Sequence, residues 1–152
     1  MTRRLPALGL EDTAARILAA CAAREPQVDP WEASLPEPLD CEPWASDRAA
    51  SALCDIAWAM VRVNDNRRAL DHVRAAAAEA RAWRLSLPEA QQGAPVDLSV
   101  KPRPNVRVAL RQAIRALADA DMSSGSARGR CIRDAEAYLR AAGEALIAQG
   151  AE

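Results

Sequence analysis

Residues 46–87 read SDRAASALCDIAWAMVRVNDNRRALDHVRAAAAEARAWRLSL, and this stretch decides the fold class. In its first half, apolar residues recur at three- and four-residue steps: Leu53, Ile56, Ala57 and Met60. A similar series follows after residue 66: Ala69, Leu70, Val73, Ala76, Ala77 and Ala80. This spacing is typical of one buried face of a helix. Asn64-Asp65-Asn66 separates the two series, and Asn and Asp suit both the end of one helix and the cap of the next. The stretch therefore predicts two antiparallel helices, the first capped at Ser46.

This hairpin resembles a single tetratricopeptide repeat, in which small residues sit where the two helices cross. Ala57, Ala69 and Ala76 stand at those positions. The resemblance covers residues 53–80, about one unit of a ~34-residue repeat. The chain departs from the family where a turn glycine is usual, because Asn64 stands there. What the resemblance implies is a helical hairpin.

Three further helices are expected outside the hairpin. One covers residues 10–24 and is expected to pack on the hairpin. Asn105 can cap a second, which runs to about Asp121, and the third runs from about Arg130 to Gln149 after a turn at residues 123–129. The inward residues of the last two helices are expected to be Val106, Leu110, Ala113, Ile114 and Leu117, then Ile132, Ala135, Leu139, Ala142 and Leu146. The sequence thus predicts an all-α fold: a small helical bundle of about five helices, an N-terminal helix plus two antiparallel hairpins.

Composition favours one domain spanning residues 1–152, with loops at 25–45 and 88–104. Half the residues are apolar, many of them alanine, and Phe is absent, so we expect a thin core with closely spaced helices. The net charge of −1 argues against a dedicated nucleic-acid-binding protein. No apolar run approaches the ~20 residues of a membrane span, and Met1-Thr2-Arg3-Arg4 lacks a following apolar segment. We therefore expect a cytoplasmic protein with no membrane partner.

Residues 25–45 form an unusual acidic, proline-rich stretch. It holds two acid-Pro-Trp triplets, Asp29-Pro30-Trp31 and Glu42-Pro43-Trp44. Proline stiffens an extended chain, and tryptophan offers a large contact area, so the stretch predicts a site for another protein with a basic groove. The candidate partner-binding residues are Asp29, Trp31, Glu32, Glu37, Asp40, Glu42 and Trp44. In the other interpretation, the loop is an ordered surface segment whose tryptophans fold back onto a thin core.

Arginines in the C-terminal half form an alternative, nucleic-acid-binding site. The candidates are Arg107, Arg111, Arg115, Arg128 and Arg130. Such residues neutralise phosphates, but no aromatic residue interleaves them in the sequence, which argues against base stacking. They can equally form a solvated face paired with Asp119, Asp121 and Asp134.

Few residues suggest catalysis or metal binding. The four cysteines and His72 show none of the short spacings of a zinc site, so no metal and no cofactor are expected. Arg67 and His72 resemble, in their Arg-x4-His spacing, the motif of the HEPN ribonucleases, where such residues orient and cleave a phosphodiester. In one continuous helix, however, these two side chains would diverge by about 140°.

These features predict a non-catalytic protein–protein interaction module, an adaptor or inhibitor of a larger protein machine. Small phage- or mobile-element-encoded antagonists of bacterial defence systems have this profile. The alternatives are a nucleic-acid-associated protein and, third, an HEPN-like ribonuclease. Trp58, Cys54 and Val61 widen the apolar arc of the first hairpin helix. This helix is either covered on two sides or presents an apolar patch to a partner, which leaves a homodimer open.

Overall fold

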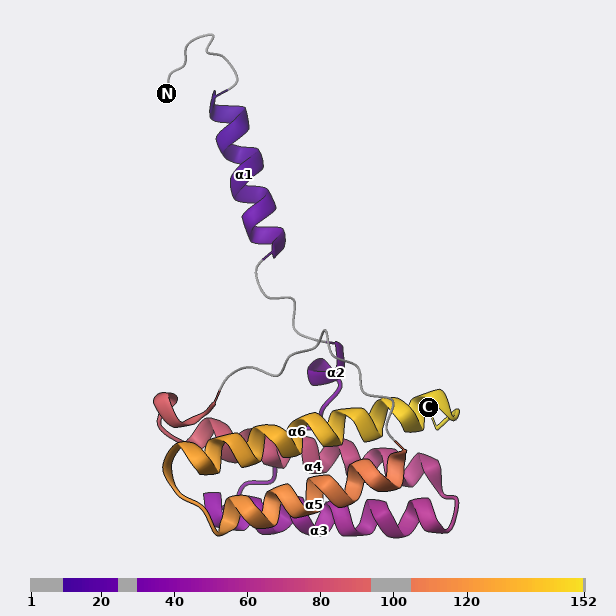
Figure 1. Ribbon diagram of the computed structural model, residues 1–152. Coiled ribbons are helices and arrows are strands. Elements are labelled where there is room, and N and C mark those ends of the chain that lie inside the picture. The colour runs from indigo at the N-terminus through magenta and orange to yellow at the C-terminus, as the bar shows by residue number, and fades with distance from the viewer. Residues whose placement is uncertain (1–9, 25–29, 94–104, 152) are drawn as a thin grey trace. The chain divides into compact units, whose positions relative to one another are not determined.

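The computed structural model describes residues 10–24, 30–93 and 105–151 (Figure 1). About 81% of these residues are helical and none of them lies in a strand, which confirms the all-α prediction. The chain divides into two compact units, Met1–Ala33 and Ser34–Glu152. The single domain and the packing of residues 10–24 on the hairpin stay predictions.

The described part of the first unit holds two helices. Helix α1 spans Leu10–Arg24, the bounds expected from the sequence, and Glu11 and Asp12 lie in its first turn, where the helix dipole favours negative charge. Helix α2 is a short turn of helix, Pro30–Ala33.

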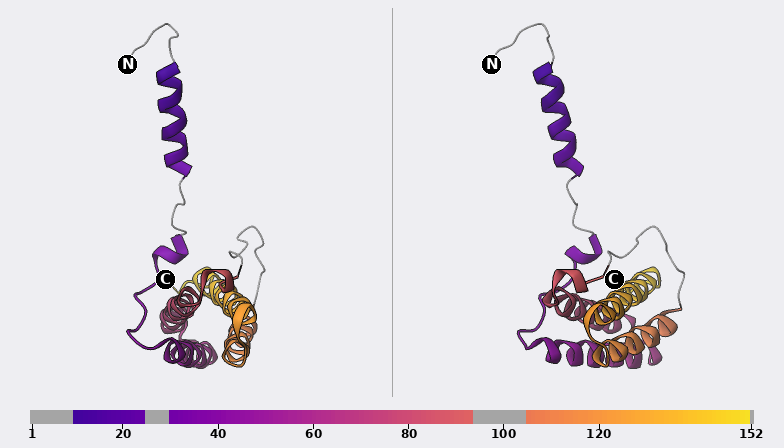
Figure 2. Two further views of the ribbon diagram at one scale, coloured as in Figure 1. Left: turned by 90° about the vertical axis from the view of Figure 1, so that its left-hand side faces the viewer. Right: turned by 60° about the vertical axis from the view of Figure 1, so that its left-hand side comes forward.

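The residues described in the second unit form a bundle of four helices in a closed ring. These helices are α3 (Pro43–Arg62), α4 (Asn66–Ser86), α5 (Val106–Asp121) and α6 (Gly125–Ala148), and a short 3-10 helix, η1 (Glu89–Gln91), follows α4. Contacts join α3 to α4, α4 to α6, α6 to α5 and α5 to α3 (Figure 2). Helix α5 begins at the end of the bundle where α3 ends (Figure 1), so each helix runs antiparallel to both of its neighbours.

Alanines make the close helix contacts, while a few larger residues fill the core. Ala57, Ala69 and Ala76, the residues expected at the helix crossing, are completely buried. The largest fully buried apolar side chains are those of Leu70, Leu110, Leu117, Ile132, Leu139 and Leu146. The inward faces predicted for α4 and α6 are confirmed, and that of α5 is confirmed except for Ile114, which is half-buried.

The inward face predicted for α3 is largely wrong. The buried residues of this helix, besides Ser46, are Asp47, Ala50, Cys54, Ala57 and Val61. Leu53 and Met60 are only half-buried, and Ile56 is 40% exposed. Helix α3 carries two apolar stripes, and the stripe of smaller residues faces α4 and α5, because closely packed helices favour small side chains at their contact.

Two helix starts also differ from the sequence-based prediction. Helix α3 starts at Pro43, not at Ser46, because proline is well tolerated in the first helical turn. Helix α6 starts at Gly125, about five residues before the predicted Arg130, with Ser124 as its N-cap. The expected turn at residues 123–129 is therefore mostly helical.

The other helix ends agree with the sequence. Asn64 has a left-handed backbone (φ 61°), and the Asp65 side chain accepts a hydrogen bond from the N–H of Arg68 at 3.3 Å. Asn105 caps α5 by accepting from the N–H of Arg107 at 2.9 Å. These caps satisfy backbone donors that the first turn of a helix leaves without partners.

Gly129, in α6, permits a close approach of η1 to the bundle. A Cβ atom at this position would lie 1.6 Å from the carbonyl oxygen of Gln91. Since no side chain fits there, glycine is required inside α6 despite its low helix propensity.

Candidate functional site

The acidic segment, defined here as residues 34–44, is held against the bundle by a buried glutamate. Glu79, on α4, is only 1% exposed. Its carboxylate accepts a hydrogen bond from the backbone N–H of Leu39, and its Oε2 lies 3.9 Å from the thiol of Cys41. The Cys41 sulfur also lies 3.1 Å from the hydroxyl oxygen of Ser46 at the start of α3. A buried carboxylate requires such partners, so Glu79 holds the segment against α4 and α3.

The charged and aromatic side chains of this segment point into solvent. Glu37, Asp40 and Glu42 are exposed, and Trp44 is 60% exposed. Trp44 lies in the first turn of α3, and the guanidinium carbon of Arg48 lies 5.3 Å from the centroid of its ring. The segment therefore exposes three carboxylates and one indole ring, while Glu79 holds its backbone against the bundle.

The candidate partner-binding residues divide between the two units. Asp29 lies outside the described residues. Trp31, which is buried, and Glu32, which is half-buried, belong to α2 in the first unit. The remaining four residues lie in the second unit, on or next to the start of α3: Glu37, Asp40, Glu42 and Trp44. The buried Trp31 fits the interpretation that this tryptophan serves folding, whereas the exposed Trp44 fits a binding role.

The candidate arginines occupy different surroundings. Arg107, Arg111 and Arg115 are exposed along α5, and Arg130 is exposed on α6.

Arg128, in contrast, is half-buried and bridges two helices. Its Nε donates to the carbonyl oxygen of Ala120 at 3.1 Å, and its Nη2 donates to that of Asp121 at 3.4 Å. Its guanidinium also lies 5.7 Å from the ring centroid of Trp83. Arg128 thus satisfies carbonyls at the end of α5 rather than joining a surface with the other arginines.

An aromatic residue that is distant in sequence lies beside the arginines of α5. The guanidinium carbon of Arg111 lies 4.5 Å from the ring centroid of Trp58 on α3, a cation–π geometry. One of these arginines therefore has an aromatic neighbour in three dimensions, although no aromatic residue interleaves them in the sequence. The amphipathic pattern did not reveal this contact, because it depends on the register between α3 and α5.

A pair of carboxyl groups lies at the end of the bundle where α3 starts and α5 ends. Asp47, on α3, is 3% exposed and its side chain hydrogen-bonds to that of Asp121, the last residue of α5. Burial, followed by the hydrogen bond and the negative charge of Asp121, raises the pKa of Asp47 to about 7, although Arg128 and Arg48 act in the opposite direction. Because α3 starts at Pro43, Asp47 lies beyond the first turn of the helix, and its side chain is buried.

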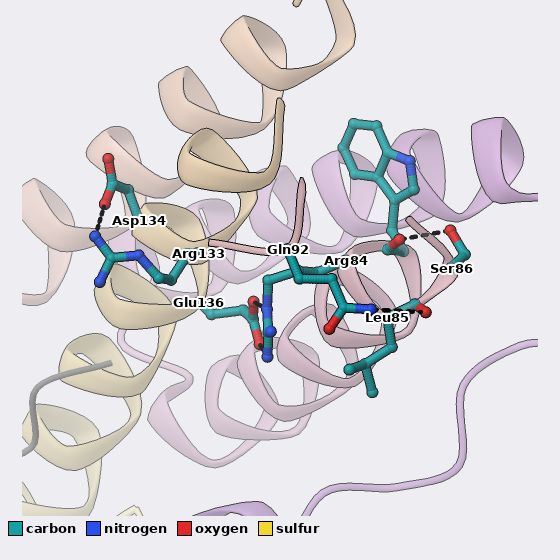
Figure 3. A network of polar contacts seen from close by, with 8 residues as sticks. Arg84, Leu85, Ser86, Gln92, Arg133, Asp134 and Glu136 are labelled. Atoms are coloured by element: carbon teal, nitrogen blue, oxygen red, sulfur yellow. Dashed lines mark hydrogen bonds and ion pairs between the residues drawn. The ribbon is translucent and has the colours of Figure 1, made fainter. Parts of the chain in front are cut away.

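A bidentate ion pair joins α4 to α6 (Figure 3). The Nε of Arg84 donates to Oε2 of Glu136, and its Nη2 donates to Oε1 at 3.3 Å. Their side chains are 16% and 10% exposed. Nearby, Gln92 donates to the carbonyl oxygen of Leu87 at 3.0 Å and so ties the segment after η1 to the end of α4. This network is explained by packing and carries no separate chemistry.

Arg67 and His72 lie in the same continuous helix, α4, where Arg67 is exposed and His72 is half-buried. Five residues along an α-helix rotate a side chain by about 140°, so these two side chains do not converge on one point.

The described residues support neither metal binding nor membrane insertion. No group of three or more His, Cys, Asp or Glu side chains there is placed to hold a metal ion. None of the described helices combines the length and apolarity required to cross a bilayer.

Comparison with known proteins adds no relative. No protein-family model matches the chain, and neither a curated protein nor a solved structure matches it.

Proposed function

We propose that this chain is a non-catalytic interaction protein, an adaptor or inhibitor that binds a larger protein through its acidic segment. The observation that carries the proposal is the combination of a fixed backbone with outward side chains. Glu79 holds the segment from the bundle side, while Glu37, Asp40 and Glu42 remain exposed. A segment ordered before binding loses less conformational entropy when a partner docks, which favours affinity.

The chemistry of the segment indicates a partner with a basic groove and an apolar pocket. Three carboxylates would be attracted by a basic surface and would accelerate encounter. The exposed indole of Trp44 supplies an anchor of the kind that dominates binding energy at interfaces. An antagonist that blocks a basic functional groove of its target would have this arrangement.

Affinity capture from lysate of the natural host, with nuclease added, tests the proposal. We expect one protein to be recovered with the wild-type chain and to be lost with Trp44→Ala, since truncating an aromatic anchor lowers affinity by about tenfold or more. Trp44 is preferred to Trp31 for this test, because Trp31 is buried and its truncation would also perturb folding.

Two further variants sharpen this experiment. The triple variant Glu37→Gln, Asp40→Asn, Glu42→Gln should weaken capture most at low salt, where charge attraction is least screened. Met122→Ala is the matched control, because Met122 is 88% exposed but lies outside the acidic segment, directly after α5. Equal recovery of the same protein by wild type, Trp44→Ala and the triple variant would refute the role of this segment.

A further inference from the structure

A second surface of the bundle, formed by α3 and α5, carries positive charge next to an ordered aromatic ring. Its centre is the stack of Arg111 on Trp58, with 4.5 Å between the guanidinium carbon and the ring centroid. The stacked guanidinium is pre-ordered, and its outer face and N–H groups remain available, since Arg111 is exposed.

The antiparallel register of α3 and α5 brings two more arginines to this surface. Arg62 lies one helical turn beyond Trp58, and Arg107 lies one turn before Arg111, so both fall on the same side of the stack. Val61 and Arg107 line one cavity, which confirms that these two turns are adjacent. We name Trp58, Arg62, Arg107 and Arg111 the Trp58–arginine surface.

The arginines of this surface are not neutralised within the described part of the chain. Arg62, Arg107 and Arg111 are exposed, and no described carboxylate forms an ion pair with any of them. In contrast, Arg68 and Arg84 have carboxylate partners, Asp65 and Glu136. The positive charge is therefore available to an external anion, although the net charge of the chain is −1.

A polar cavity adjoins the surface where α3 ends and α5 begins. Its volume is about 240 Å³, and no carboxylate of the described residues lines it. Its polar lining comes from Asn64, Asn66, Asn105, Arg107 and Gln149. Side-chain amides both donate and accept hydrogen bonds, as the edges of nucleobases do, and Arg107 belongs to both the cavity and the charged surface.

We propose that the Trp58–arginine surface binds single-stranded nucleic acid. The arginines contact consecutive phosphates, the Arg111–Trp58 stack supports a base, and the amide-lined cavity receives the neighbouring base. Arg107 and Arg111 are separated by about 6 Å along α5, a spacing suited to neighbouring phosphates of an extended strand. Amides and a planar guanidinium stack favour a nucleic acid over an acidic peptide, which offers no base to stack or pair. The proposal is independent of the acidic segment and of its protein partner.

Titration of fluorescently labelled oligo-dT and oligo-U of about a dozen nucleotides, read by anisotropy, tests the proposal. Three phosphate contacts on a single strand predict a slope of log K against log salt of about −2, hence a loss of affinity of about 20-fold between about 50 and 200 mM salt. The double variant Arg107→Gln, Arg111→Gln should lose most of the binding and lower the slope to about −0.7.

Three single variants separate the contributions. Arg111→Lys keeps the charge but removes the planar stack, so we expect a several-fold loss of affinity with an unchanged salt slope. Gln149→Ala should also weaken binding at constant slope, because Gln149 lines the cavity and carries no charge. Arg48→Gln is the control, since Arg48 is exposed near the start of α3, at the opposite end of the bundle, and should leave affinity unchanged to within twofold. Circular dichroism verifies that each variant is folded.

Three results would contradict the proposal. Absence of binding up to about 100 µM protein at low salt, the weak limit of ordinary nonspecific affinity, would overturn the proposal. Equal binding by wild type and the double variant would overturn the assignment to this surface. Tighter binding of a polyglutamate peptide than of either oligonucleotide would replace nucleic acid by an acidic protein segment as the ligand.

Discussion

The buried carboxyl group of Asp47 makes the stability of the bundle sensitive to pH. Its neighbours are Asp121 from α5, Arg128 from α6 and Arg48 from its own helix. Its pKa in the folded protein is about 7, against 3.8 for an ordinary aspartate. Between these two values the folded protein holds a proton that the unfolded chain has released.

We therefore predict that the free energy of unfolding falls as pH rises through this window. The slope cannot exceed about 1.4 kcal/mol per pH unit, and the loss is complete above the folded-state pKa of about 7. Asp47→Asn keeps a hydrogen-bonding group beside Asp121 but cannot ionise. Chemical denaturation at pH 5.5 and pH 8 should show that wild type loses about 1–2 kcal/mol relative to this variant between the two pH values.

Asp119→Asn serves as the control for Asp47→Asn, because Asp119 is exposed on the same helix as Asp121. Its pH profile should match that of wild type. If Asp47→Asn also retained the wild-type profile, another group would be responsible for the pH dependence.

At the scale of one element, the order of the acidic segment depends on the carboxylate of Glu79. Replacing Glu79 by alanine leaves the N–H of Leu39 without its acceptor and removes the neighbour of the Cys41 thiol. We predict a loss of stability of about 1–3 kcal/mol, together with faster amide hydrogen exchange across residues 37–42. In helices away from this contact, amide exchange should become faster only by the amount that the lower free energy of unfolding explains.

Hydrogen exchange followed by mass spectrometry checks this prediction, with Glu144→Ala as control. Glu144 is exposed on α6, where its partner is Arg140 at 3.3 Å. Unchanged exchange across residues 37–42 in Glu79→Ala would show that the segment is ordered by other contacts. The prediction of partner binding would then lose its structural support.

Comparison of the single helices shows which parts of the fold follow from the periodicity of the sequence. Helices α4, α5 and α6 each have one apolar stripe, so their inward faces could be predicted from spacing alone. Helix α3 has two, one with Ala50, Cys54 and Ala57 and the other with Leu53, Ile56 and Met60. Hydrophobicity favours the second stripe, but close helix packing selects the first, and single-helix patterns do not contain that information.

The candidate sites depended on tertiary contacts in a similar way. The exposure of Glu37, Asp40 and Glu42 agrees with their predicted place on a surface segment. The role of Glu79 could have been suspected, since a single acid inside the alanine-rich run of residues 75–80 needs a partner when buried. The stack of Arg111 on Trp58 could not have been predicted, because it joins residues 53 positions apart and depends on the register of two helices.

At the scale of the whole molecule, the ring of four helices contains its own core. Among the described residues, the largest fully buried apolar side chains all belong to residues 34–152, and each of the helices α3 to α6 has two neighbours within this unit. We predict that a chain beginning at Ser34 folds by itself, with the helix content expected for α3 to α6 and a single cooperative thermal transition. Circular dichroism during heating measures both. A chain beginning at Pro43, which lacks residues 34–42 of the acidic segment but keeps all four helices, is the comparison. It should unfold at a lower temperature, because the carboxylate of Glu79 would be left buried without the N–H of Leu39. A non-cooperative or absent transition for residues 34–152 would instead favour the single domain of residues 1–152 that composition predicts.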